Sequence, residues 1–86
     1  MASCQVEFVR SATKDLRRID KERISTILEK IGSLAENPRP QGCKKLSGSE
    51  RTYRIRIGDY RVIYEVEDDR LIVLVIRVRH RSEAYE

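Results

Sequence analysis

The chain has 86 residues, of which 40% are hydrophobic and 37% are charged, and its formal net charge is +4. This length predicts a single domain over residues 1–86, and the mixed composition excludes general disorder. The sequence contains no apolar run of 18 residues and no secretory signal, so we expect a cytoplasmic protein that makes no use of a membrane.

Cysteine and histidine are scarce in this chain. Cys4 and Cys43 are too few for a disulfide framework, and with His80 as the single histidine a structural zinc site is not expected. The sequence also lacks a glycine-rich phosphate loop and a Ser/His/Asp set. We therefore expect free thiols, no metal site and no cofactor.

The first half of the chain predicts one strand and two helices. Residues 4–9 alternate roughly between apolar and polar side chains, which fits a short strand. Ser11 is expected to cap a helix that begins near residue 12, and Asp20 to cap a second helix with apolar residues at helical spacing. Pro38 should stop this second helix near Asn37. The two helices would form a hairpin.

The second half of the chain predicts a meander of strands. Residues 37–50 are rich in proline, glycine and serine and predict a loop. From residue 51 the pattern has a period of two, which predicts strands at about 51–57, 60–67 and 71–79. The order βααβββ predicts an α+β fold, with the helical hairpin packed on one face of a mostly antiparallel four-stranded sheet.

The first hairpin of this meander carries arginines that a stable sheet does not need. Gly58 suits the first position of a two-residue type II′ turn, which would place Arg56 directly opposite Arg61 on the face away from the helices. Like charges in such positions destabilise a sheet by a few tenths to about 1 kcal/mol. We therefore predict an anion-binding face. The alternative is a solvated face with ion pairs to Glu65 and Glu67.

The last strand extends this face in the predicted register. Pairing of Val66 with Ile72 would place Arg61 opposite Arg77 and would turn the even-numbered residues of the last strand toward the helices. The face would then gather the guanidinium groups of Arg54, Arg56, Arg61, Arg77, Arg79 and Arg81. A guanidinium group is always charged and its planar fork of donors matches phosphate, so this face predicts a site for a phosphodiester. Preorganised cations also stabilise the charge that develops during phosphoryl transfer.

Proton transfer needs other side chains, because arginine stays protonated. His80 is the single histidine, a residue type that can serve as acid or base at neutral pH, but strand parity places it on the helix side unless the strand ends by about residue 79. Tyr85 can donate a proton or stack on a base, and Lys44 and Lys45 can contact a backbone phosphate. Each of these has a structural alternative: a packed histidine, a tail residue and solvated lysines. Chemistry without a metal favours RNA over DNA as the substrate, because RNA carries its own nucleophile, the 2′-hydroxyl. The product of its attack would be a 2′,3′-cyclic phosphate.

Residues 44–85 resemble the RelE toxins of bacterial and archaeal toxin–antitoxin pairs, most specifically in "YRIRIGDYRVIYEV" and "HRSEAY". RelE proteins bind in the ribosomal A site and cut mRNA there, so the resemblance implies a ribosome-dependent endoribonuclease that inhibits translation. It implies phosphate-stabilising roles for Arg61 and Arg81, and it places a C-terminal aromatic at Tyr85. It also implies a basic pair at Arg54 and Arg56. The best-known pattern has lysines at this pair, one of them proposed as the base, so the arginines here leave proton transfer to His80 or Tyr85.

The resemblance also implies partners. We expect an acidic, partly disordered, RelB-like antitoxin that forms a hetero-oligomer with this chain, and the ribosome with its mRNA as the target. ParE-type toxins are similar in fold, lack the catalytic set and act on DNA gyrase, and they are the main alternative. A member that has lost its toxicity is another. The presence of Arg61, Arg81 and Tyr85 favours the ribonuclease.

Overall fold

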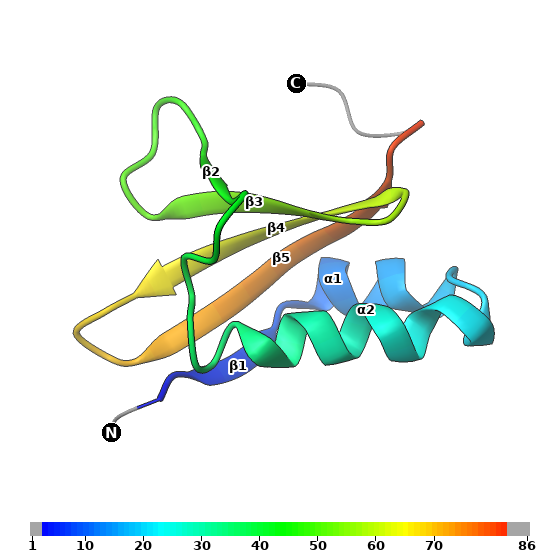
Figure 1. Cartoon of the computed structure of the whole chain (residues 1–86), viewed down its shortest axis with the longest axis horizontal. Coiled ribbons are helices and arrows are strands. Elements are labelled where there is room, and N and C mark those ends of the chain that lie inside the picture. The colour runs from blue at the N-terminus through cyan, green and yellow to red at the C-terminus, as the bar shows by residue number, and fades with distance from the viewer. Residues whose placement is uncertain (1–2, 83–86) are drawn as a thin grey trace.

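Residues 3–82, which the computed structural model describes, form a five-stranded sheet covered by two helices (Figure 1). In chain order the elements are β1 (Gln5–Phe8), α1 (Arg10–Arg17), α2 (Lys21–Ser33), β2 (Lys44–Lys45), β3 (Thr52–Ile57), β4 (Tyr60–Glu67) and β5 (Ile72–His80). The sheet order is β1-β5-β4-β3-β2, with β1 parallel to β5 and the other pairs antiparallel. The predicted α+β class is confirmed. Neither helix in the described part of the chain has the length and apolar character needed to cross a membrane.

The expected four strands omit β2, which lies in the segment predicted to be a loop. β2 is only two residues long, and it pairs Lys44 with Arg54 and Lys45 with Tyr53. A strand this short produces no alternation that a sequence pattern can reveal. Its pairing adds a lysine beside the arginines of β3.

The predicted start of the first helix is wrong by two residues. α1 begins at Arg10, and the residue before it, Val9, is extended and makes no side-chain cap. Ser11 lies inside the helix, where its hydroxyl donates a hydrogen bond to the carbonyl oxygen of Ile76 at 2.9 Å. The Ser11 side chain, which the sequence predicted to cap the helix, therefore binds the backbone of β5 instead.

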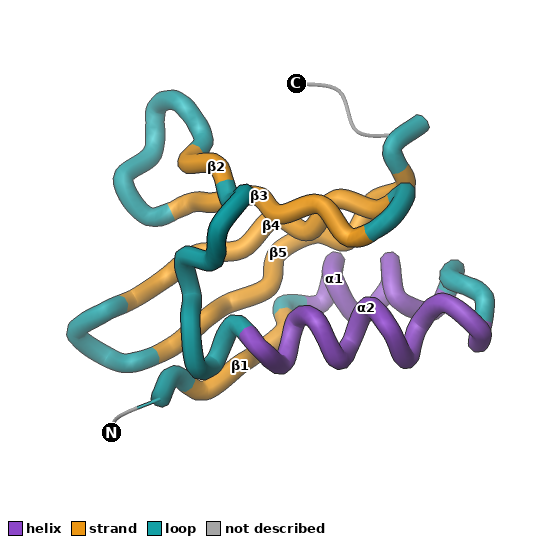
Figure 2. The backbone as a smooth tube through the Cα atoms, in the orientation of Figure 1, coloured by secondary structure: helices purple, strands orange, loops and turns teal. Residues whose placement is uncertain are grey.

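Both helices pack on the same face of the sheet (Figure 2). The helices contribute Ala12, Ile27 and Ile31 to the buried core, and Leu34 follows α2. The sheet contributes Ile55, Ile57, Val62, Tyr64, Val66, Val73, Val75 and Val78. Full burial of one aliphatic side chain of this size stabilises the fold by about 1.5–3 kcal/mol. This core occupies one face of the sheet. The opposite face carries the charged side chains of the strands together with Ile63, Ile72 and Leu74.

The β3–β4 hairpin has the predicted register, and the β4–β5 hairpin does not. Arg56 pairs with Arg61 as expected. Val66, however, pairs with Val73, because the loop over residues 68–71 holds Leu71 at a φ of 55°. A non-glycine residue in the left-handed region is uncommon, and nothing in the sequence signals it.

A β-bulge interrupts the pairing of β4 with β5. Tyr64 pairs with Val75, but the preceding residue of β4, Ile63, pairs with Arg77, so Ile76 is an extra residue in β5. A bulge of this kind shifts the alternation of side chains by one position. The expectation that even-numbered residues of the strand face the core is therefore wrong before the bulge and correct after it.

Candidate phosphate-binding site

The sheet face opposite the helices carries basic side chains in cross-strand register. Arg56, Arg61 and Arg79 form one row across β3, β4 and β5, so the expected pairing of Arg61 with Arg77 is wrong. Lys44 and Arg54 form a second row across β2 and β3. Paired residues project from the same face. We call this set the basic face: Lys44, Arg54, Arg56, Arg61 and Arg79.

The charge on this side of the sheet is polarised along the strands. The basic face lies toward the β3–β4 turn. Toward the β4–β5 loop the same side carries Glu65, which pairs with Thr52 on β3 and with Leu74 on β5, and Glu67, which pairs with Ile72. Unlike charges are thus placed at opposite ends, and like charges stand directly opposite one another in the Arg56–Arg61–Arg79 row. The row would therefore attract an anion that binds across it.

The β3–β4 turn gathers two further contacts from basic residues. Gly58 has a φ of 59°, which agrees with the first position of a type II′ turn. The Nε of Arg56 donates to the Gly58 carbonyl at 3.3 Å, and the backbone N–H of Arg81 donates to the Asp59 carbonyl at 2.7 Å. Arg81 follows β5 directly, so this bond holds it at the same end of the sheet as Arg56.

Arg77 is held by a carboxylate. Its Nε lies 2.9 Å from Oδ2 of Asp15, and its Nη2 lies 3.1 Å from Oδ1 of the same residue. The Asp15 side chain is only 11% exposed, so water screens this pair weakly. Its charge is already matched, and we therefore leave Arg77 out of the phosphate-binding set that the sequence suggested.

His80 lies on the helix side of the sheet. β5 extends to His80, which pairs with Tyr60, and the two rings meet edge to face with centroids 5.2 Å apart. Nδ1 of His80 lies 2.9 Å from the Ser82 hydroxyl and accepts the Ser82 backbone N–H at 3.2 Å. Strand parity predicted this side, and the strand does not end early enough to bring His80 to the basic face.

The remaining predicted site residues divide between three places. Lys44 belongs to the basic face, whereas Lys45 pairs with Tyr53 and points to the other side of the sheet. Tyr85 lies outside the described residues.

A polar cavity of about 280 Å³ opens at the outer edge of β5, between α1 and the end of the sheet. Arg79 and His80 both line it, so residues from both faces of β5 border this cavity.

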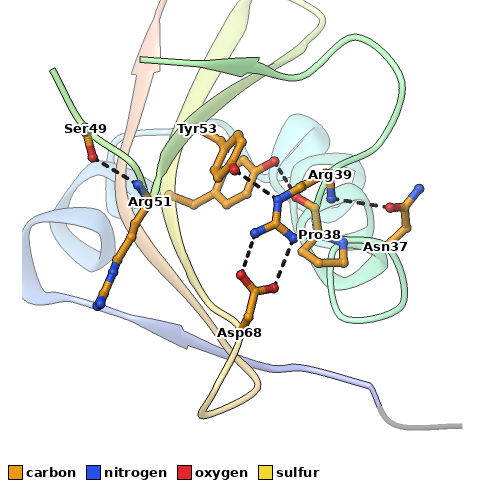
Figure 3. A network of polar contacts seen from close by, with 8 residues as sticks. Asn37, Pro38, Arg39, Ser49, Arg51, Tyr53 and Asp68 are labelled. Carbon is orange, nitrogen blue, oxygen red and sulfur yellow. Dashed lines mark hydrogen bonds and ion pairs between the residues drawn. The ribbon is translucent and has the colours of Figure 1, made fainter. Parts of the chain in front are cut away.

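A polar network that the sequence did not suggest ties two loops to β3 at the other end of the sheet (Figure 3). Arg39 forks onto Asp68 with N–O distances of 3.1 and 2.7 Å, and its Nε donates to the Tyr53 hydroxyl at 3.0 Å. The guanidinium carbon lies 5.2 Å from the centre of the Tyr53 ring. The hydrogen bonds to Asp68 raise the pKa of Arg39 and lower the pKa of Asp68. The network stabilises loops and lies away from the basic face.

Comparisons with known proteins agree with this fold. The model of the family described as "ParE toxin of type II toxin-antitoxin system, parDE" matches residues 6–85. A putative toxin RelE1 from Methanocaldococcus jannaschii is 34% identical over 94% of this chain and 93% of its own. The mRNA interferase toxin RelE of Escherichia coli K12 is 32% identical over 93% of this chain and 87% of its own.

The solved structures give the same result. The archaeal RelE–RelB complex from Pyrococcus horikoshii OT3 contains a chain that superposes with a TM-score of 0.82 at 29% identity, over 95% of this chain and 99% of that one. Both the sequence matches and the structural match extend over nearly the whole chain. The chain therefore belongs to the ParE toxin family of type II toxin–antitoxin systems and, within the RelE/ParE superfamily, is a RelE-type toxin.

Proposed function

We propose that this toxin is a ribosome-dependent mRNA endoribonuclease that inhibits translation. The observation that carries the proposal is the cross-strand row of Arg56, Arg61 and Arg79, with Arg81 anchored at the adjacent turn. The row concentrates three guanidinium groups on one surface, and a phosphodiester backbone is the polyanion whose geometry their forks fit. Relatives named mRNA interferase support the same activity.

The proposed reaction uses the nucleophile that RNA carries. The 2′-hydroxyl gives up its proton and attacks the adjacent phosphorus, and the bond to the 5′-oxygen breaks as that oxygen takes up a proton. The products are a 2′,3′-cyclic phosphate and a 5′-hydroxyl end. Negative charge grows on the non-bridging oxygens as the phosphorane forms. Arg61 and Arg81 would stabilise this charge, and Arg54, Arg56, Arg79 and Lys44 would position the backbone. Because preorganised cations supply the stabilisation and RNA supplies the nucleophile, the reaction needs no metal.

The groups that transfer protons in the proposed reaction are chosen by which side chains can give up or accept a proton. Arginine does not accept a proton at neutral pH, so the basic face can stabilise charge but cannot act as a base. Tyr85 is the phenol that we propose as proton donor or as a stacking partner for a base. His80 can serve only through a route around the edge of β5, because it pairs with Tyr60 on the helix side. We therefore place Tyr85 ahead of His80.

The proposed partner is a RelB-like antitoxin. The Pyrococcus relative was solved as a complex with RelB. An acidic, partly disordered chain would be attracted to the basic face and would order as it binds. By covering that face it would exclude mRNA, and the resulting hetero-oligomer would be inactive.

A second candidate function is that of a non-nuclease toxin that acts on DNA gyrase. The specific observation in its favour is that the matching family model is described as a ParE toxin. The position of His80 away from the basic face also leaves the described part of the site without a titrating group near neutral pH.

Induced expression in a bacterium distinguishes the two functions. The nuclease is expected to produce new mRNA 5′ ends within translated codons, mapped by primer extension, and these ends should vanish when initiation is blocked. A gyrase-directed toxin would instead induce the DNA-damage response with mRNA left intact. Growth arrest with DNA damage and no mRNA cuts would contradict the proposed function.

A further inference from the structure

The bulge at Ile76 decides which side chains of β5 reach the basic face. Before the bulge, Tyr64 pairs with Val75. If that register continued to the end of the strand, Val78 would stand opposite Arg61, because a one-residue slip exchanges the two faces of a strand. With the bulge, Arg79 stands opposite Arg61 and Val78 returns to the core. The row of guanidinium groups therefore depends on one extra residue.

Side chains of α1 bind the strand at this bulge. β1 ends at Phe8, and beyond that point, in the described part of the chain, α1 lies beside the outer edge of β5 (Figure 1). The Ser11 hydroxyl donates to the Ile76 carbonyl at 2.9 Å, and the Asp15 carboxylate accepts the Val78 N–H at 2.9 Å. Ser11 and Asp15 are four residues apart on α1, so they lie on one face of the helix. They contact β5 at the extra residue and two positions beyond it.

Asp15 makes the stronger part of this contact. Besides the Val78 N–H, it accepts both donors of the Arg77 fork. Bonds to an ionised group that is nearly buried are stronger than neutral ones, and loss of the carboxylate would leave the Val78 N–H without this acceptor. Asp15 is also the only acidic residue in the α1 sequence RSATKDLR, and it points at the sheet. Ser11 and Asp15 therefore form a clamp on the bulge, which we call the bulge clamp.

We propose that Ser11 and Asp15 are positioning residues of the candidate nuclease site: they lock the bulge at Ile76 and thereby hold Arg79 on the basic face beside Arg61. Both residues point at β5 from α1, so the role proposed for them is to position Arg79 and not to contact RNA. The lock itself follows from the geometry of the fold, and its effect on cleavage rests on the proposed function. The two parts can be tested separately.

The lock is tested by disulfide trapping in the full chain with Cys4→Ser and Cys43→Ser. Directly opposed residues of antiparallel strands have Cα atoms close enough for a disulfide. With the bulge clamp intact, Arg61→Cys with Arg79→Cys is expected to crosslink readily, and Arg61→Cys with Val78→Cys is not. In the Ser11→Ala/Asp15→Ala background the 61–78 crosslink should appear at the expense of 61–79. Thr13→Ala, on the same helix but bonded only to its own turn, is the matched control and should keep the original pattern.

An unchanged preference for the 61–79 crosslink in the folded Ser11→Ala/Asp15→Ala chain would overturn the lock. If circular dichroism shows that this double variant is unfolded, the same crosslinking measurement is made on the single variants Asp15→Asn and Ser11→Ala. Asp15→Asn can still accept the Val78 N–H but loses the ionic bonds to Arg77, so a partial shift toward 61–78 is expected. No shift in either single variant would again overturn the lock.

The effect on the reaction is tested by single-turnover cleavage of mRNA on ribosomes. Asp15→Ala is expected to slow cleavage by about 10- to 100-fold, the scale of a misplaced group at a reacting centre. The half-saturating toxin concentration should rise much less than the rate falls, because Arg54, Arg56 and Lys44 still contact the RNA backbone. Asp15→Asn should recover part of the rate, and Thr13→Ala should match the unmodified chain. A crosslink shift without any loss of cleavage would overturn the positioning role. A crosslink shift in a chain that never cleaves mRNA would uphold the lock and overturn the proposed function instead.

Discussion

Replacement of Arg61 by alanine is expected to slow mRNA cleavage on the ribosome by about 100- to 1000-fold, the usual cost of losing one preorganised donor to a developing oxyanion. Arg61 is the middle member of the Arg56–Arg61–Arg79 row, so its guanidinium has a cation on either side. A phosphorane bound on the row would lose its central contact in the variant. Arg81→Ala should have an effect of the same order, measured as the single-turnover rate.

The control for this prediction is Arg70→Ala, which removes the same charge from the β4–β5 loop. Arg70 makes an exposed ion pair with Glu67 at 3.2 Å, and such pairs contribute little to stability. This variant should cleave mRNA at the unmodified rate. Arg61 is not part of the buried core, so Arg61→Ala removes no core packing and should remain folded. Equal rates for the Arg61→Ala and Arg70→Ala chains would contradict the proposed role of the row.

Replacement of Tyr64 by alanine is expected to remove a large part of the stability of the fold. Tyr64 is fully buried, its ring stacks on Tyr53 with centroids 6.0 Å apart, and its hydroxyl donates to the Pro38 carbonyl at 2.7 Å. Truncation of a buried aromatic costs about 3–5 kcal/mol. A domain of this size has about 4–13 kcal/mol in total. Urea unfolding of the purified chain gives the value, and a loss below about 1 kcal/mol would contradict the packing described here.

Tyr64→Phe isolates the contribution of the hydroxyl and gives the stability a pH dependence that can be checked. Burial, with a smaller contribution from Cys43, raises the pKa of Tyr64 above its usual value. The unfolded phenol ionises above about pH 10 while the folded one stays neutral. Stability from this residue is therefore complete below pH 10 and is lost as the pH rises further, by up to about 1.4 kcal/mol per pH unit.

The comparison of the two chains isolates this effect. Tyr64→Phe should unfold more easily than the unmodified chain at neutral pH, by about 1 kcal/mol for the lost hydrogen bond. Above pH 10 the difference should shrink, because only the unmodified chain has this phenol to ionise. Urea midpoints measured from pH 8 to 11 on both chains provide the test. Parallel pH profiles would show that the phenol of Tyr64 titrates alike in the folded and unfolded chains.

The β3–β4 hairpin could be predicted residue by residue because its information is local. Gly58 fixes the turn type, and the period-two pattern on either side fixes the faces, so the pairing of Arg56 with Arg61 followed from the sequence. The helical hairpin over the sheet followed for a similar reason, since each helix has its own apolar stripe. The predicted side of His80 is also correct, but only because the bulge at Ile76 returns the even-numbered residues of β5 to the helix side.

The register of β5 could not be predicted, because non-local contacts set it. Leu71 takes a left-handed conformation that leucine rarely adopts, and the bulge at Ile76 is bonded by Ser11 from 65 residues away in the chain. The sequence therefore placed Arg77 where Arg79 stands. The ion pair between Arg39 and Asp68 was not predicted for the same reason, since 29 residues separate the partners in the chain.

The most direct test of the proposed chemistry is cleavage of a ribosome-bound mRNA that carries a single 2′-deoxynucleotide at the scissile position. If the basic face stabilises the phosphorane formed by 2′-hydroxyl attack, the all-ribose mRNA will be cut to a 2′,3′-cyclic phosphate, and the substituted mRNA will bind but remain uncut at that position. Cleavage of both mRNAs at the same rate would show that the 2′-hydroxyl is not the nucleophile, and it would contradict the function proposed for this toxin.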